Sequence, residues 1–324
     1  MSGTNAAAPI SRRLLGLTAL AALTAGVLVS GQSRINAELS DEVGSGFTAA
    51  WISFGVGLLA VGAIALAFPA VRAGLAALPR ILRAGSLRWW QLLGGVGGAW
   101  LVTTQGLVVP VVGVTLFMVS VVAGQVLGSL LADRFGLGPA GVLPISLRRG
   151  GAALLAGIAV GIAAWPQLGD QQASWVLAAA LVAGGGVAIQ QAINGRVASA
   201  TGQPFAATTV NFVVGLAALT FVLSLQALLG NVVLPEWPST WWLYLGGPIG
   251  VLFIALAAWA VKPLGVLAFG LLAIAGQLLG ALVLDLTLPS AVEPDLSLLL
   301  GLTLLAVAVV LAATASRSRL GGGR

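Results

Sequence analysis

The 324-residue chain has no cysteine and no histidine, and only 7% of its residues are charged. Without cysteine there are no disulfides or thiolates, and without histidine the commonest metal ligand and the side chain that titrates near neutral pH are missing. These absences exclude a serine–histidine triad and a histidine-based zinc site. The glycine-rich segment GGGVAIQ also lacks the Lys-Ser/Thr pair of a phosphate-binding loop. We therefore expect no enzyme activity, no metal and no cofactor.

Apolar residues are what the chain has in excess. They make up 59% of the sequence and give a mean hydropathy of +1.06, well above the average for soluble domains. This composition predicts an all-α integral membrane protein surrounded by the lipid bilayer. The net charge of +6 is carried by basic residues scattered singly between apolar runs, not by a basic stripe with aromatics, so we expect no nucleic-acid partner.

Charge-free windows of membrane-spanning length predict ten transmembrane helices. The windows lie at 14–33, 47–71, 89–110, 112–132, 150–169, 174–195, 205–230, 239–261, 264–284 and 296–316. The least distinct boundary is VVPVVG, where only Pro110 and Gly113 separate two apolar runs. A single helix over residues 89–132 would be about twice the length needed to cross a bilayer, so we place a break there.

Basic residues indicate the orientation, because Lys and Arg concentrate in cytoplasmic loops. With a cytoplasmic N-terminus and ten spans, the inner segments collect Arg12, Arg13, Arg72, Arg80, Arg83, Arg88, Arg134, Arg148, Arg149, Arg196, Lys262, Arg317, Arg319 and Arg324. Only Arg34 falls outside. We expect a multi-pass protein with both termini in the cytoplasm.

The chain contains an internal repeat. A shift of 158 aligns residues 32–57 with 190–215 at nine identities in 26 positions, and a shift of 152 aligns 113–133 with 265–285 at ten in 21. Residues 1–169 and 170–324 are therefore predicted to be two copies of a five-helix unit. Because five is odd, the second copy must enter the membrane from the opposite side, which is an inverted-topology repeat.

The fourth span of each copy carries the same motif, AGQVLGSLLAD at 123–133 and AGQLLGALVLD at 275–285. Its glycines, spaced four apart, favour close contact between helix backbones. Gln125 and Gln277 lie near mid-span, where an amide must find a partner. That partner is either a neighbouring helix or a substrate.

The motif ends at Asp133 and Asp285, which are candidates for ion or proton coupling. They lie at span ends, where an alternative role as helix caps or orientation signals needs no special chemistry. Coupling to protons requires a carboxylate buried enough to raise its pKa. Asp285, followed by the apolar LTLPSAV, fits this better than Asp133, which adjoins Arg134.

Further candidates for the wall of a substrate cavity are Trp100, Gln105 and Asn211, although such residues in spans are often simply packed. The stretch VSGQSRINAEL at 29–39 ends the first apolar run and, taken alone, resembles the end of a secretory signal. Its repeat counterpart QQAINGRV lies in mid-chain, so we expect a retained span. The i, i+4 pairs Gln32/Asn36 and Gln190/Asn194 then mark two equivalent helix faces, which act either as gates or as interhelical locks.

The sequence resembles the YdcZ-like bacterial inner-membrane family, a branch of the drug/metabolite transporter superfamily. The resemblance lies in the motif GQSRINAEL with its counterpart QQAINGRV, in the doubled AGQ sequence and in the five-plus-five plan. The resemblance runs from about Leu14 to Ala315. It implies an export permease for small molecules in the bacterial inner membrane but no particular substrate. Small multidrug-resistance relatives have a mid-membrane Glu in their first span, and LLGLTALAALTAGVLVSG has none. Proton-coupled extrusion of cationic drugs is therefore not implied.

We predict a transporter of a small metabolite or drug-like molecule that works by alternating access. Gln125 and Gln277 lie near its midplane site, and the Gln/Asn pairs flank that site. Two alternatives stay open: a non-transporting scaffold or accessory subunit, and a transporter of lipids or lipid-linked intermediates with a sideways opening lined by Leu and Phe. A homodimer is a further expectation.

Overall fold

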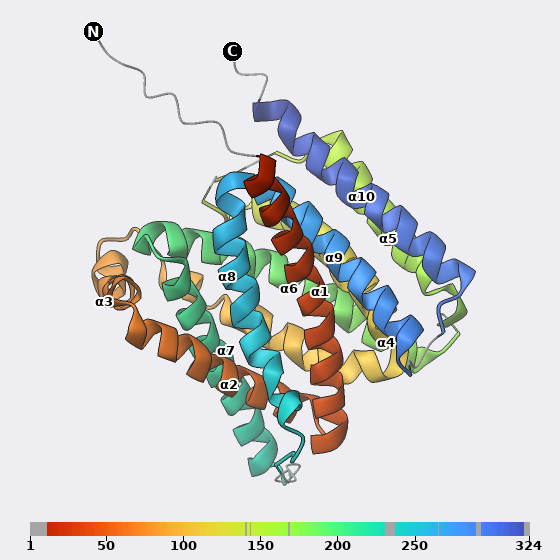
Figure 1. The fold of residues 1–324 in the computed structure, drawn as a ribbon, viewed down its shortest axis with the longest axis horizontal. Helices are drawn as coiled ribbons and strands as arrows, with labels where there is room; N and C mark the ends of the chain where they lie inside the picture. Colours follow the sequence, from red (N-terminus) through yellow and green to blue (C-terminus); the bar gives the residue numbers. More distant parts are fainter. Residues whose placement is uncertain are drawn as a thin grey trace.

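The computed structural model describes residues 12–139, 141–142, 144–167, 169–230, 237–264, 266–289 and 293–320, and this part of the chain is all-helical, without strands (Figure 1). The α-helices are α1 (Arg12–Val43), α2 (Gly46–Ala67), α3 (Pro69–Arg83), α4 (Gly95–Arg134), α5 (Leu147–Ala163), α6 (Gln171–Thr201), α7 (Pro204–Leu228), α8 (Gly246–Leu264), α9 (Val266–Thr287) and α10 (Leu296–Leu320). Short 3-10 helices, η1 (Trp89–Leu92), η2 (Trp165–Gln167) and η3 (Trp241–Leu245), complete the fold. The predicted boundary between the two copies falls between α5 and α6.

Six helices of the described chain are long and apolar enough to cross a membrane. They lie in α1, α2, α4 with η1, α6, α7 and α9, and shorter apolar stretches cover Trp241–Ile254 and Leu296–Leu311. A chain with so many apolar helices can satisfy its backbone hydrogen bonds inside lipid, because each helix pairs its own N–H and C=O groups. The described helices are those of a multi-pass membrane protein.

Helix α4 contains two of the predicted spans and is broken between them. Gly113 has φ 76° and ψ 170°, which is not helical and which glycine adopts without a Cβ clash. Pro110, one turn earlier, lacks the N–H that a continuous helix would use. The predicted break at VVPVVG is confirmed, and it gives α4 two segments, residues 95–112 and 114–134.

The expected span at 47–71 is too long. Helix α2 ends at Ala67, Phe68 is extended with φ −112° and ψ 107°, and Pro69 begins α3. A residue before proline is disfavoured in helical conformation, whereas proline fits the first turn of the next helix. Charge-free windows cannot detect this break, because both sides of it are apolar.

Helix α3 lies where the sequence predicted only a basic loop. Its apolar side, with Leu78, Ile81 and Leu82, packs against Val197 of α6 and Ala207 of α7. Its arginines are exposed on the other side. Between α7 and η3 of the second copy, the described residues form no helix.

Helices of the two copies pack against each other in matched pairs. Helix α4 packs on α6 and α1 on α8 and α9, while α2 pairs with α7 and α5 with α10, the last two lying side by side in Figure 1. A Cβ atom placed on Gly124 would lie 2.0 Å from the Leu181 carbonyl oxygen, and one on Gly276 would lie 2.1 Å from that of Leu23. The repeat relates these two contacts, because the shift of 152 pairs the two glycines and the shift of 158 pairs the two leucines. The predicted close backbone contact at the AGQ motif is confirmed.

Candidate functional site

A central cavity lies between the two halves of the chain. The cavity has a volume of about 210 Å³, which is many times what one water needs. The wall comes from seven helices and consists of Val29, Gln32, Ser53, Phe54, Gly98, Leu101, Val102, Gln125, Val187, Gln190, Gln191, Asn194, Thr208, Asn211, Phe212, Gly247, Gly250, Phe253, Ile254 and Gln277. None of these described lining residues is charged.

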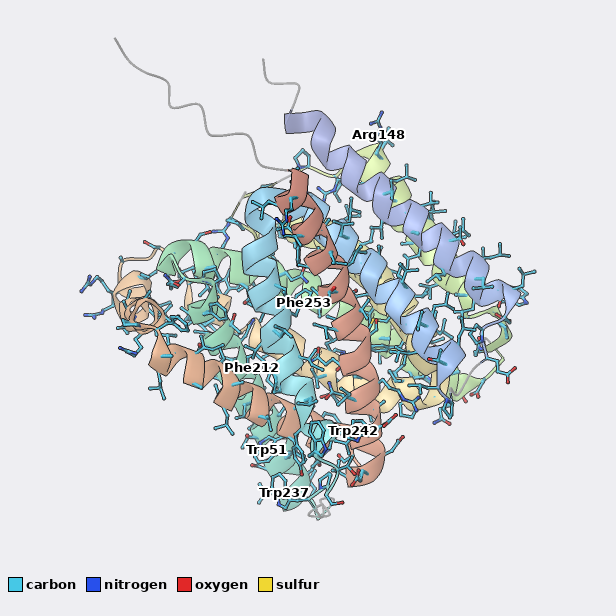
Figure 2. The ribbon with its side chains drawn as sticks, viewed as in Figure 1. Trp51, Arg148, Phe212, Trp237, Trp242 and Phe253 are labelled. Carbon is cyan, nitrogen blue, oxygen red and sulfur yellow. The ribbon has the colours of Figure 1, made fainter. Side chains whose placement is uncertain are left out.

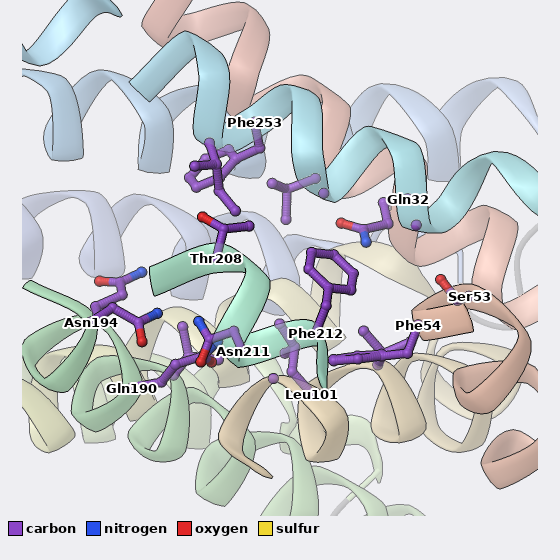
Figure 3. Close-up of a pocket in the computed structure, with 18 of the residues that line it drawn as sticks. Gln32, Ser53, Phe54, Leu101, Gln190, Asn194, Thr208, Asn211, Phe212 and Phe253 are labelled. Carbon is purple, nitrogen blue, oxygen red and sulfur yellow. The ribbon is translucent and has the colours of Figure 1, made fainter. Parts of the chain in front are cut away.

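Six of the predicted substrate-binding residues meet in this wall: Gln32, Gln125, Gln190, Asn194, Asn211 and Gln277. Figure 3 shows Gln190, Asn194 and Asn211 gathered at one end, with Thr208 beside them. Gln32 and Ser53 lie at the other end, and Phe54 and Phe212 lie between the two groups. The fold therefore brings together amides that are more than 150 residues apart in sequence.

Most of these amides are not used by the fold. Among the described residues, no hydrogen bond is made by the side chains of Gln125, Gln190, Asn194 or Asn211. Gln277 is only 7% exposed, and its Oε1 atom is buried without a donor. A buried acceptor left unpaired costs about 1–3 kcal/mol, so a donor on a bound molecule would be favourable there. The Gln32 Nε2 atom, in contrast, donates to the Gly246 carbonyl oxygen at 2.9 Å.

Three of the predicted residues do not line the cavity. Asn36 Nδ2 donates to Gln105 Oε1 at 2.6 Å, and Gln105 Nε2 donates to Ser33 Oγ at 2.9 Å. All three residues of this cluster are fully buried between α1 and α4. Trp100 also lies outside the lining, with its indole N–H buried and without an acceptor among the described residues.

The two aspartates also lie outside the cavity wall. Asp133 forms an ion pair with Arg149. Asp285 is buried and accepts hydrogen bonds from the backbone N–H groups of Val114 at 3.1 Å and Thr115 at 2.6 Å. These are the first N–H groups after the break in α4, where a carboxylate is favoured by the positive end of the helix dipole. This places Asp285 as a cap supplied by another helix, and its role in coupling stays a prediction.

The sequence reasoning missed the two phenylalanines at the centre of the cavity. The ring centroids of Phe54 and Phe212 lie 5.2 Å apart, with their planes at 49°. A Cβ atom on Gly57 would lie 2.2 Å from Phe212 Cε1, and one on Gly215 would lie 2.3 Å from Phe54 Cε1. Each ring thus packs over the other copy's glycine. The signal was available, because Phe54 and Phe212 are identical positions of the same repeat alignment.

The described part of the chain is all-helical, has many apolar helices and encloses a central cavity whose described lining residues carry no charge, which is the architecture of a polytopic membrane transporter. The chain belongs to the family described as "Putative inner membrane exporter, YdcZ", whose model matches it twice, over residues 17–162 and 175–311. It is therefore a multi-pass inner-membrane protein of a transporter family, and the predicted family membership is confirmed.

A solved structure, described as "Crystal structure of protein", is similar to this chain in fold. The two share 17% identity with a TM-score of 0.56, and the alignment covers 96% of this chain and 100% of the other. At this identity the likeness concerns the fold alone. No curated protein matches the chain significantly.

Proposed function

We propose that the protein is a permease that carries a small neutral or zwitterionic molecule across the inner membrane by alternating access. The observation that carries this proposal is the central cavity, walled by amides from both halves of the chain. A site shared by two halves can be exposed to one side and then to the other when the halves move against each other.

The arrangement of the helices supports two inverted repeats with both termini in the cytoplasm. Helix α1 begins and α10 ends at the same end of the molecule (Figure 1). Arg148 lies towards this end, whereas Trp51, Trp237 and Trp242 lie towards the opposite end (Figure 2). This distribution agrees with basic residues on the cytoplasmic side and with aromatic residues at a membrane interface.

The chemistry of the wall favours a ligand without net charge. A charged ligand would lose its hydration in the cavity and find no countercharge among the described residues of the wall. Each amide offers both a donor and an acceptor. A ligand bearing both kinds of group, with an apolar face for Phe54 and Phe212, fits this wall.

Thermal-shift screening of the purified protein against neutral, zwitterionic, cationic and anionic metabolites, followed by counterflow of the hits in proteoliposomes, tests the proposal. We expect neutral or zwitterionic hits whose flux falls at least tenfold in the Gln125→Leu/Gln277→Leu variant. Gln226→Leu, at the far end of α7 and outside the cavity, is the matched control and should transport normally. Hits confined to charged compounds would contradict the proposed ligand class, and absence of flux for every hit would favour a scaffold.

A second candidate function has an observation of its own. An open groove between α2 and α7 is lined by Leu58, Val213, Leu216, Ala217, Thr220, Phe221 and Ser224. Leu58 and Leu216 pack against the cluster that contains Phe54 and Phe212, so groove and cavity share a wall. A lipid carrier with a sideways, Leu- and Phe-lined opening would need a groove of this kind beside its cavity. Translocation of a fluorescent phospholipid in proteoliposomes, blocked by Ala217→Trp, would favour this alternative.

A further inference from the structure

The two ends of the central cavity are related by the repeat but differ in their hydrogen bonds. At the α1 end, Gln32, Ser33, Asn36 and Gln105 are all engaged with one another or with Gly246. At the α6 end, the counterparts of Gln32 and Asn36, which are Gln190 and Asn194, form no side-chain hydrogen bond with any described residue and line the cavity instead. The amides at the α1 end are thus hydrogen-bonded within the protein, whereas their counterparts at the α6 end are not bonded to any described residue.

Helix packing at the α1 end is close. Helix α1 packs along α4, the helix that carries Gln105. A Cβ atom on Gly246 would lie 2.3 Å from Asn36 Oδ1, while one on the equivalent Gly94 would lie 2.9 Å from Asn194 Oδ1. At this pair of glycines, the contact is tighter at the α1 end.

The difference in hydrogen bonding between the two ends is also present in the sequence, because two of the three cluster residues are not repeated. The shift of 152 pairs Gln105 with Ala257, and the shift of 158 pairs Ser33 with Gln191. Alanine cannot accept the bond that Asn36 gives to Gln105, so the α6 end cannot build the same cluster when it closes. The Ser33–Asn36–Gln105 cluster therefore has no counterpart with the same residues at the α6 end.

We infer that Ser33, Asn36 and Gln105 form a one-sided lock, which holds the outer end of the cavity shut and makes the cytoplasm-facing state the resting state. The assignment of sides rests on the proposed function and its orientation, in which α1 ends at the outer face. Since the lock has no inner equivalent, a substrate is loaded from the cytoplasm at rest. This is the loading side that export requires.

The absence of native cysteine permits a direct test. Ser53→Cys and Thr208→Cys place single reporters at the outer and inner ends of the cavity wall. The rate of reaction with a membrane-impermeant maleimide is measured in right-side-out and inside-out vesicles. In the otherwise unchanged chain, we expect Thr208→Cys to react from the inner side and Ser53→Cys to be protected from the outer side.

Adding Gln105→Leu removes two interhelical bonds. Losing two interhelical hydrogen bonds in a bilayer is expected to raise the outward-open population by roughly tenfold. The outer reaction of Ser53→Cys should accelerate by that factor, and the inner reaction of Thr208→Cys should slow. Thr104→Val is the matched control, because Thr104 is equally buried but its hydroxyl bonds only within its own helix, to Leu101 O. Ser33→Ala, which removes one bond, gives a smaller increase and serves if Gln105→Leu fails to fold.

Two results would overturn the lock. In the first, Ser53→Cys stays protected from the outer side in both the Gln105→Leu and the Ser33→Ala background. In the second, Ser53→Cys is already labelled from the outer side without either change. Flux in proteoliposomes is measured on the same variants. Unchanged labelling with flux intact refutes the lock alone. Shifted labelling without flux of any compound refutes the transport function and leaves the lock in place.

Discussion

Replacing Gly184 by alanine tests how tightly α6 packs on α4. A Cβ atom there would lie 2.0 Å from the Val121 carbonyl oxygen and 3.0 Å from the Gln125 backbone nitrogen. Carbon and oxygen normally approach to about 3.3 Å, so the two backbones must move apart by roughly 1 Å. No side-chain rotation can relieve the clash, because both obstructing atoms belong to the main chain. Overpacking of this kind costs about 1–3 kcal/mol.

The adjacent Gly185 supplies the control. A Cβ atom there would have its nearest neighbour, the Gly124 carbonyl oxygen, at an ordinary 3.7 Å. Alanine at this position should be neutral or stabilise α6 by up to about 1 kcal/mol through helix propensity. The first half offers a similar comparison. Gly26, the repeat counterpart of Gly184, would place a Cβ atom 2.0 Å from the Ala273 carbonyl oxygen, whereas Gly31 on the same helix faces open space. Thermal unfolding in nanodiscs, followed by tryptophan fluorescence, gives the ranking, and a Gly184→Ala protein as stable as Gly185→Ala would refute the packing argument.

Three carboxylates give further predictions. Asp285→Asn turns one of the two carboxylate acceptors into a donor that faces the buried N–H groups after the break in α4, and it should lower stability by about 1–3 kcal/mol. Asp133→Asn loses only a partly exposed ion pair and should lower stability less in the same unfolding assay. Equal losses for the two variants would contradict the capping role of Asp285. Hydrogen bonds from Leu298 N and Ser297 Oγ hold the pKa of Asp295 below its usual value. A lowered folded-state pKa stabilises the fold above the unfolded pKa of about 3.9, and this stabilisation is lost as the pH falls through the folded value. The parent should therefore have a higher Tm than Asp295→Asn at pH 6, and this difference in Tm should shrink as the pH falls below the unfolded pKa. A difference in Tm that does not change with pH would contradict stabilisation by the Asp295 charge.

The sequence predicted features that follow from composition, periodicity and repetition. The break at Gly113 could be predicted because proline and glycine have intrinsic backbone preferences. Six amide side chains of the cavity could be predicted because amides are unusual in apolar spans. The repeat also places several of them at equivalent positions of the two copies. Phe54 and Phe212 were missed because an aromatic residue in an apolar helix looks like ordinary packing.

Other features depend on tertiary contacts that no local pattern encodes. Asp285 binds backbone N–H groups, which every residue but proline carries, so nothing in the sequence points to Val114 and Thr115 as its partners. Gln105 and Asn36 looked like cavity residues, yet they satisfy each other because α1 and α4 meet there. Helix α3 was not predicted, because its arginines suggested a loop. Its apolar side finds its partners only in the folded protein, where α6 and α7 cover it.

The cap on α4 has a consequence for biogenesis. The ribosome makes Val114 well before Asp285, which follows 171 residues later. Until α9 has been inserted, the second segment of α4 must leave two N–H groups to water, to lipid headgroups or to a chaperone. This segment of the first half therefore completes its hydrogen bonds only after α9 has been synthesised and inserted. A first half expressed alone should be degraded quickly, and co-expression of the second half should rescue it.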